Sequence, residues 1–243
     1  GGKPTKKPQQ VRIDSSPAIV GDEPVLIARN TNCPVAIATQ RRRAAEELIE
    51  HCDCDLILCD DGLQHYALDR DIEIAVIDGQ RRFGNGHCLP AGPLREPLSR
   101  LSSVDLVVSK NNAARHEYKM EYHYGDLVSL VDQNKTLPIS HFAGENMHAV
   151  AGIGNPDRYF SYLRNHKINI IKHEFADHHP FTAEDLNFGD GLPVVMTEKD
   201  AVKCMEFADE RHWYLPIKAE LPVSFNYRLD NLTKEIIDGQ EIT

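Results

Sequence analysis

The stretch Asp55-Leu56-Ile57-Leu58-Cys59-Asp60-Asp61-Gly62 (residues 55–62) joins a short apolar run to two carboxylates and a glycine. Two further apolar runs follow it, at Ile72–Ile77 and Val104–Val108. Continuous apolar runs of this length are typical of strands buried on both faces, as in a parallel sheet covered by helices. The sequence therefore predicts an α/β fold, with residues 55–59 as one of its buried strands.

Strand-like and helix-like segments alternate on both sides of this stretch. Upstream, the pattern predicts a strand at 34–38 and a helix at 41–51. Downstream, it predicts strands at 147–152, 168–173, 193–196 and 213–216, and helices at 157–166 and 199–207. The polar and aromatic segment from about 111 to 146 favours an antiparallel ribbon. We therefore expect two α/β lobes with mostly parallel sheets, covering 1–115 and 147–243, joined by a β-ribbon linker at 116–146.

Composition is that of a folded globular chain. The 243 residues are 41% hydrophobic and 26% charged, and the formal net charge is −10. This charge disfavours a nucleic-acid binder, which needs clustered Lys and Arg. The run Arg41–Arg43 is a local exception, either as an anion contact or as a solvated helix face. No run of about 18 apolar residues predicts a membrane-spanning helix, so the chain as given looks soluble. No protein partner is indicated.

Asp60 and Asp61 directly follow the first apolar run, where a strand would leave the sheet. A carboxylate pair at this position is similar to a Walker B motif and suits Mg²⁺, directly or through water. Gln64 and His65 add polar groups immediately afterwards. The alternative is an ordinary D-D-G turn.

Gly21-Asp22-Glu23-Pro24 lies where a loop meets an apolar segment. Asp22 is either a helix cap or a general base, since phosphoryl transfer to an alcohol needs a group that accepts the hydroxyl proton. His178 lies in Phe175–Phe181, after a strand-like run. A histidine near a carboxylate more often orients or tunes it than binds a metal, so we favour tuning.

Two later segments also carry candidate ligand contacts. The Gly-, Pro- and Arg-rich loop 81–97 contains Arg95, which could clamp a phosphate, and Glu96, which could hold a sugar hydroxyl or an arginine. A rigid surface loop with a salt bridge is the alternative. Lys199 and Lys203 lie in a helix that opens after a strand, and each is either a nucleotide-phosphate contact or part of a solvated face.

Seven short motifs together resemble those of the lipid A 4'-kinases, also called tetraacyldisaccharide 4'-kinases. They occur in the family's order over about 200 residues: G-D-E-P (21–24), D-D-G-L-Q-H (60–65), R-R-F-G-N-G (81–86), L-P-A-G-P-L-R-E-P (89–97), A-G-I-G-N-P (151–156), F-A-D-H-H-P-F (175–181) and M-T-E-K-D-A-V-K (196–203). The resemblance implies Rossmann-like, P-loop-type lobes. It also implies a membrane-associated kinase that uses ATP and Mg²⁺ to phosphorylate the 4'-hydroxyl of tetraacyldisaccharide 1-phosphate, giving lipid IVA for lipid A biosynthesis. The expected location is the cytoplasmic face of the bacterial inner membrane.

The resemblance also implies residue roles. Asp22 would be the catalytic base, with His178 as its partner. Asp60 and Asp61 would serve the magnesium site. Contacts to substrate or phosphate would come from Gln64, His65, Arg41, Arg95 and Glu96, and Lys199 would contact the nucleotide.

One departure from the family pattern is large. The family has a hydrophobic anchor and then a Walker A loop, and no G-x-x-x-x-G-K-[ST] occurs in this sequence. We therefore expect a truncation that removed both, and expect the chain as given to transfer phosphate poorly or not at all. Two other function classes remain as alternatives. One is a metal-dependent hydrolase that uses Asp60, Asp61, His65, His87 and His178, and the other is a non-catalytic module that binds a lipid or a partner.

Overall fold

Segments far apart in the sequence build each of two units in the computed structural model, which describes residues 7–240. Unit 1 combines the chain up to Ile57 with Tyr124–Ile217, and unit 2 combines Leu58–His123 with the chain from Lys218 onward. The chain therefore passes from one unit to the other three times. The domain boundaries predicted from the sequence stay a prediction, and the two units are described separately below.

A six-stranded sheet with the order β7-β6-β11-β10-β8-β9 forms the centre of unit 1. Its strands are β6 (Leu127–Ser129), β7 (Thr136–Leu137), β8 (Asn146–Ala151), β9 (Asn169–Glu174), β10 (Val194–Thr197) and β11 (His212–Leu215). The pairs β9–β8, β8–β10 and β10–β11 are parallel, whereas β6 runs antiparallel to β11 and β7. The loops that follow β8, β9 and β10 therefore leave the same edge of the sheet.

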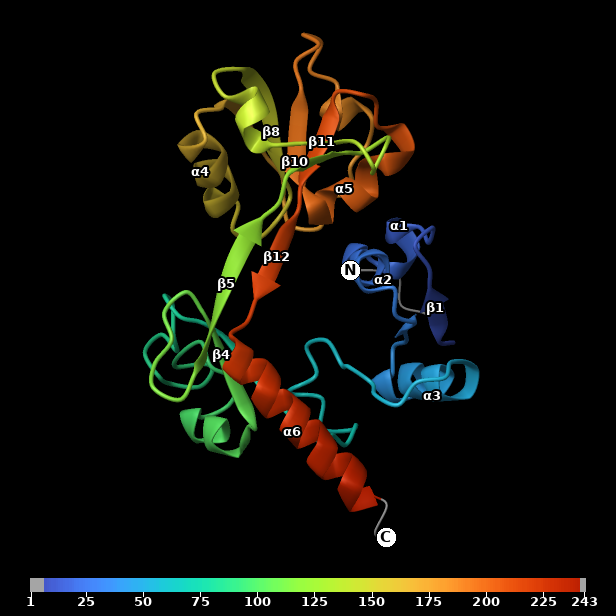
Figure 1. Cartoon of the computed structure of the whole chain (residues 1–243), viewed down its shortest axis with the longest axis vertical. Coiled ribbons are helices and arrows are strands. Elements are labelled where there is room, and N and C mark those ends of the chain that lie inside the picture. The colour runs from blue at the N-terminus through green and yellow to red at the C-terminus, as the bar shows by residue number, and fades with distance from the viewer. Residues whose placement is uncertain (1–6, 241–243) are drawn as a thin grey trace. The chain divides into compact units, whose positions relative to one another are not determined.

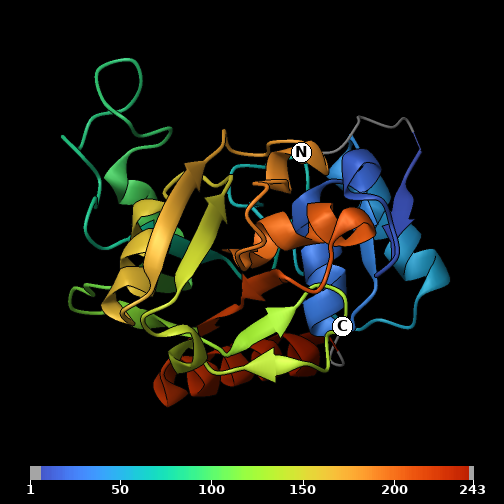
Figure 2. The same cartoon turned by 90° about the horizontal axis from the view of Figure 1, so that it is seen from above.

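Helices α4 (Asp157–Asn165) and α5 (Glu198–Cys204) cover opposite faces of this sheet (Figures 1 and 2). Alternate residues of a strand point to opposite faces, so β10 contributes to both cores. Val195 packs in the core with Phe160 of α4, and Met196 packs in the other core with Ala201 of α5. Burial on both faces explains why these strands read as continuous apolar runs.

The first part of the chain packs against α5. It comprises β1 (Gln9–Val11), α1 (Pro17–Val20), α2 (Asp22–Thr31), β2 (Val35–Ile37) and α3 (Arg41–His51), and β1 pairs antiparallel with β2. Val25 of α2 is fully buried in a cluster that includes Val202 of α5. This contact holds the start of α2 beside the sheet edge where the loops after β8, β9 and β10 emerge.

Unit 2 contains a four-stranded sheet with the order β12-β5-β4-β3. Its elements are β3 (Ile74–Asp78), β4 (Leu106–Lys110), β5 (Tyr118–Tyr124), β12 (Ile217–Glu220) and α6 (Val223–Gln240). Strands β3, β4 and β5 are parallel. The core joins Leu106, Val108 and Met120 of the sheet to Phe225 and Leu232 of α6.

Short 3-10 helices complete the description: η1 (Leu98–Ser103), η2 (Ile139–Phe142), η3 (Glu184–Leu186) and η4 (Met205–Phe207). Across residues 7–240, no helix combines the length and apolar character that crossing a bilayer requires. The expected α/β architecture with mostly parallel sheets is confirmed.

The predicted strand at 55–59 is wrong. These residues have no regular secondary structure, and Leu58 and Leu56 are 85% and 60% exposed. A strand forms only when neighbouring strands satisfy its backbone N–H and C=O groups. None of the strands of the described chain pairs with this segment.

The predicted antiparallel ribbon between about 111 and 146 is only partly correct. Strands β6 and β7 do form an antiparallel pair, but they belong to the unit 1 sheet. Strand β5 instead runs parallel to β4 and lies next to β12. Helix α6 was not predicted, although Phe225, Leu229 and Leu232 recur at helical spacing.

Candidate active site

Asp22 is a buried carboxylate at the first residue of helix α2. Gly21 lies between α1 and α2 and has a φ of 99°. Residues with a Cβ atom rarely adopt such a positive φ, whereas glycine does so readily. Pro24 is tolerated in the first turn, because the first N–H groups of a helix have no partner within it. Asp22 is only 4% exposed, so its charge depends on nearby partners.

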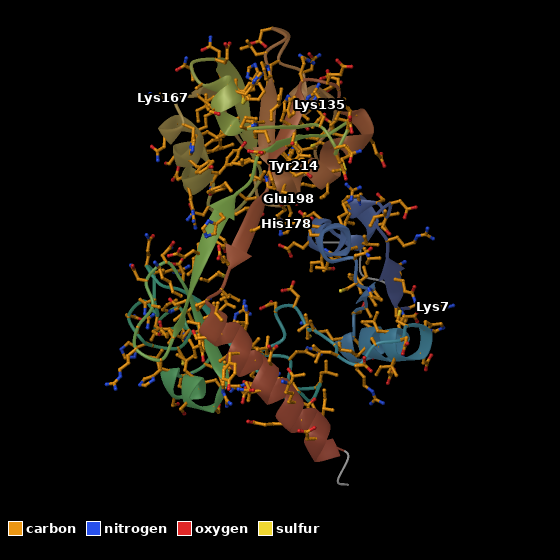
Figure 3. All side chains as sticks on the ribbon, in the orientation of Figure 1. Lys7, Lys135, Lys167, His178, Glu198 and Tyr214 are labelled. Carbon is orange, nitrogen blue, oxygen red and sulfur yellow. The ribbon has the colours of Figure 1, made fainter. Side chains whose placement is uncertain are left out.

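His178 supplies the nearest of these partners. It lies in the loop after β9, with φ of 61°, and its label in Figure 3 marks its place in unit 1. Its Nδ1 lies 3.1 and 3.2 Å from the two carboxylate oxygens of Asp22. An ionised carboxylate only accepts hydrogen bonds, so the Nδ1–H of His178 donates to it. The family resemblance predicted that Asp22 and His178 lie together. The structure confirms this contact, although 156 positions separate the two residues in the sequence.

Two lysines of α5 add positive charge around Asp22. Lys203 Nζ lies 3.7 Å from Asp22 Oδ2, and Lys199 Nζ lies 2.9 Å from Glu23 Oε1 and 3.4 Å from Asp177 Oδ1. Burial raises the pKa of Asp22, but Lys199, the hydrogen bond from His178 and the charge of Lys203 together outweigh it. The pKa of Asp22 is therefore below its ordinary value, and the carboxylate is ionised at neutral pH.

Lys199 keeps its charge in the same cluster. Burial lowers the pKa of Lys199, but the hydrogen bond to Glu23 and the nearby carboxylates raise it above the ordinary value overall. The predicted nucleotide contact of Lys199 stays a prediction, since its ammonium is paired within unit 1.

Sequence reasoning did not single out Asp177 or Asp200, which both contact this cluster. Asp200 is fully buried, and its Oδ1 lies 2.7 Å from Lys203 Nζ. Thr197 caps α5 by accepting a hydrogen bond from the backbone N–H of Asp200. Thr197, Asp200 and Lys203 are three residues apart, which places them along one side of a helix. This spacing is the sequence feature from which their contact could have been predicted.

The remaining predicted residues of the phosphate and metal sites, apart from Arg41, lie in unit 2. Arg95 Nη1 donates a hydrogen bond to Gln64 Oε1 at 3.2 Å. Glu96 accepts a hydrogen bond from the hydroxyl of Tyr66, and this bond is the main reason that its pKa is lowered. The structure thus brings Gln64, Arg95 and Glu96 into one group. The sequence left two alternatives for this loop: contacts with a ligand, or pairing within the loop. The same side chains could serve either role, so the choice between the two alternatives stays open.

Asp60, Asp61 and His65 belong to the irregular segment before β3. Asp61 has φ of 48°, a left-handed conformation that suits a tight turn. Within residues 7–240 no three His, Cys, Asp or Glu side chains gather as a metal site. The predicted magnesium role of the two aspartates is untested by this geometry, because Mg²⁺ in kinases is held by one or two carboxylates together with substrate phosphates.

Arg41 is the first residue of α3 in unit 1. The helix begins and ends at the predicted residues, but none of its side chains is fully buried. Its neighbour Arg42 pairs with Glu46 at 2.8 Å, one turn further along the helix. The anion contact predicted for Arg41 stays a prediction.

The fold is that of an α/β protein with parallel sheets, and one of its units holds a buried carboxylate hydrogen-bonded to an imidazole. The model of the tetraacyldisaccharide-1-P 4'-kinase family matches residues 1–234. The tetraacyldisaccharide 4'-kinase of Nitrosococcus oceani is 51% identical over 235 residues, covering 97% of this chain and 69% of the relative. That of Hahella chejuensis is 46% identical over 238 residues, covering 97% and 70%. The chain therefore belongs to the tetraacyldisaccharide-1-P 4'-kinase family, which is a family of phosphotransferases.

A solved structure supports the fold independently. The crystal structure of LpxK from Aquifex aeolicus, described as in complex with ATP, superimposes with a TM-score of 0.74. The superposition covers 96% of this chain and 75% of the Aquifex aeolicus chain, and the two sequences are 22% identical. At this identity the likeness shows the fold. The hydrolase and non-catalytic alternatives are not favoured by these findings.

Proposed function

We propose that this protein transfers the γ-phosphate of ATP to the 4'-hydroxyl of tetraacyldisaccharide 1-phosphate, giving lipid IVA. Membership of the kinase family supports the reaction type. The observation that carries the proposal is the hydrogen bond between His178 and the buried Asp22. This pair is the acid–base apparatus that transfer to an alcohol requires.

In the proposed reaction, the 4'-hydroxyl oxygen forms a bond to the γ-phosphorus as the bond from that phosphorus to the β,γ-bridging oxygen breaks. ADP leaves with the electron pair of the broken bond, and Asp22 accepts the hydroxyl proton. His178 holds the carboxylate in place through Nδ1–H and stabilises its charge before the proton arrives. Its side chain is 40% exposed, so it also gives the pair an open side toward solvent.

Asp60 and Asp61 have the oxygen donors that fit Mg²⁺, which would neutralise the charge of the nucleotide phosphates when bound. Gln64, Arg95 and Glu96 form a group with donors and acceptors suited to a phosphate and a sugar hydroxyl. We assign this group, together with His65 and Arg41, to contacts with substrate or phosphate. Lys199 is assigned to the nucleotide. The proposed location is the inner-membrane surface, where the lipid-linked disaccharide resides.

The test is a steady-state kinase assay with γ-labelled ATP and the lipid acceptor, using the protein as the organism makes it. We expect His178→Ala to lower kcat by about 10²–10⁴-fold, because it removes support from the general base, while ATP affinity changes little. His141→Ala is the matched control, since His141 is an exposed histidine of the same unit. An equal loss of kcat and ATP affinity would assign His178 a structural role, and the absence of labelled product from the unchanged protein would refute the function.

A further inference from the structure

A buried lysine lies directly behind Asp22 and takes no part in the mechanism described above. The side chain of Lys203 is only 10% exposed, and its Nζ lies 3.7 Å from Asp22 Oδ2. The ammonium also lies 5.0 Å from the ring centroid of Phe181, which covers it. A buried ammonium is costly unless a carboxylate pairs with it, so its position calls for a partner.

Asp200 is that partner, and it is fixed in place by the backbone of the sheet edge. It is fully buried, and its Oδ1 lies 2.7 Å from Lys203 Nζ. Its Oδ2 accepts hydrogen bonds from the N–H of Gly152 at 2.8 Å and from the hydroxyl of Thr197 at 2.7 Å. Gly152 follows β8 and Thr197 ends β10, so the carboxylate is anchored to two adjacent strands.

Gly152 allows this anchoring without crowding the carboxylate. A Cβ atom at this position would lie 3.1 Å from Asp200 Oδ1 and 3.3 Å from both the Ala176 carbonyl oxygen and the Phe181 ring. The absence of a side chain therefore lets the backbone N–H approach the buried carboxylate. The charge of Lys203 is held at a fixed place relative to the strands, independently of any exposed side chain.

Several other charged groups face Asp22. They come from three elements: Glu23 from α2, Lys199 and Asp200 with Lys203 from α5, and Asp177 with His178 from the loop after β9. Lys199 is paired with the two outer carboxylates, Glu23 and Asp177. His178 carries a positive charge only when it is protonated. Lys203 is thus a buried cation within ion-pair distance of Asp22, and it lowers the pKa of Asp22 together with Lys199, whose charge has the larger effect, and the hydrogen bond from His178.

We infer that Lys203, held by Asp200, is a positioning residue for phosphoryl transfer that keeps Asp22 ionised and oriented toward the acceptor hydroxyl. This inference rests on the proposed function, in which Asp22 is the base. Because Asp200 holds Lys203, the ammonium stays beside the Asp22 carboxylate and favours its ionised form.

The inference predicts the pH dependence of a Lys203→Met variant. A nearby opposite charge lowers the pKa of a carboxyl group, so removing the Lys203 ammonium should move the acid limb of the kcat/KM profile to higher pH. The KM for ATP should stay within about twofold of the unchanged protein, and Lys203→Arg should restore the profile because it retains the charge. An acid limb that does not move would overturn the inference.

A second measurement separates this inference from the proposed function. Asp22 can be titrated in the 243-residue chain by NMR of ¹³C-labelled aspartate, with Asp22→Asn to assign its signal. We expect Lys203→Met to raise the Asp22 titration midpoint, whether or not the protein phosphorylates the lipid. A midpoint unchanged within about 0.3 pH units would refute the role of Lys203. If Lys203→Met does not fold, Lys203→Gln provides the same comparison with a polar side chain.

Discussion

Replacing Asp200 with alanine should measure how much the buried network contributes to the stability of unit 1. The carboxylate accepts from the Gly152 N–H at 2.8 Å and the Thr197 hydroxyl at 2.7 Å, and it pairs with Lys203 at 2.7 Å. Alanine removes all three contacts and leaves the ammonium with only the more distant Asp22. Because breaking one side of a buried ion pair costs about 3–5 kcal/mol, we expect the free energy of unfolding to fall by about 4 kcal/mol.

The assay is urea unfolding followed by the fluorescence of Trp213. This residue is the single tryptophan of the chain, lies in β11 of unit 1 and is 4% exposed, so its emission reports on the unit that contains Asp200. With an m-value of about 2 kcal/mol/M, the expected loss lowers the urea midpoint by about 2 M. The slope itself should not change, since the same surface is exposed on unfolding.

Two further variants separate charge from hydrogen bonding. Asp200→Asn keeps one carbonyl oxygen for the Gly152 N–H, so we expect a smaller loss than for alanine. Glu210→Ala removes an exposed carboxylate from the same unit and should change the stability by less than about 0.5 kcal/mol. A loss below about 1 kcal/mol for Asp200→Ala would refute the view that the ion pair is buried and intact.

Two other predictions concern unit 1. Phe160→Ala should lower its free energy of unfolding by about 3–5 kcal/mol, because the fully buried ring packs against the sheet, and urea titration of Trp213 emission measures this loss. Unit 1 should also lose stability as the pH falls below about 6.5. Burial, followed by repulsion from His148, lowers the pKa of His173 in the folded state, so the unfolded chain binds more protons in that range. Thermal midpoints between pH 8 and 5 check this, and a slope as steep in His173→Gln as in the unchanged chain would contradict it.

Sequence patterns predicted both the strands that are covered on two faces and helix α3, which has no fully buried side chain. Strands β8 to β11 and helix α4 lie within one or two residues of the expected positions. Residues 55–59 have an equally apolar pattern but no neighbouring strand, and Leu58 is exposed. An apolar run reports the tendency to be buried, whereas strand formation also needs a partner that local sequence does not reveal.

The candidate site was predictable only in part. Nothing in the spacing of Asp22 and His178 indicates that they meet, and their pairing was expected solely from the family resemblance. Asp200 was not predicted as part of the site, because the sequence does not distinguish a buried aspartate in a helix from an aspartate on the helix surface. Its role depends on Gly152, which is 48 positions away and approaches only in the folded sheet.

The split composition of unit 2 has a consequence for how the protein is made. Its core joins residues near Met120 to Phe225 and Leu232 of α6, about 100 residues later in the chain. Ribosomes add about 5–20 residues per second. The helix that covers the apolar side of β4 and β5 is therefore synthesised roughly 5–20 s after these strands. During translation the apolar side of this sheet therefore stays uncovered, while the intervening segment completes unit 1 first.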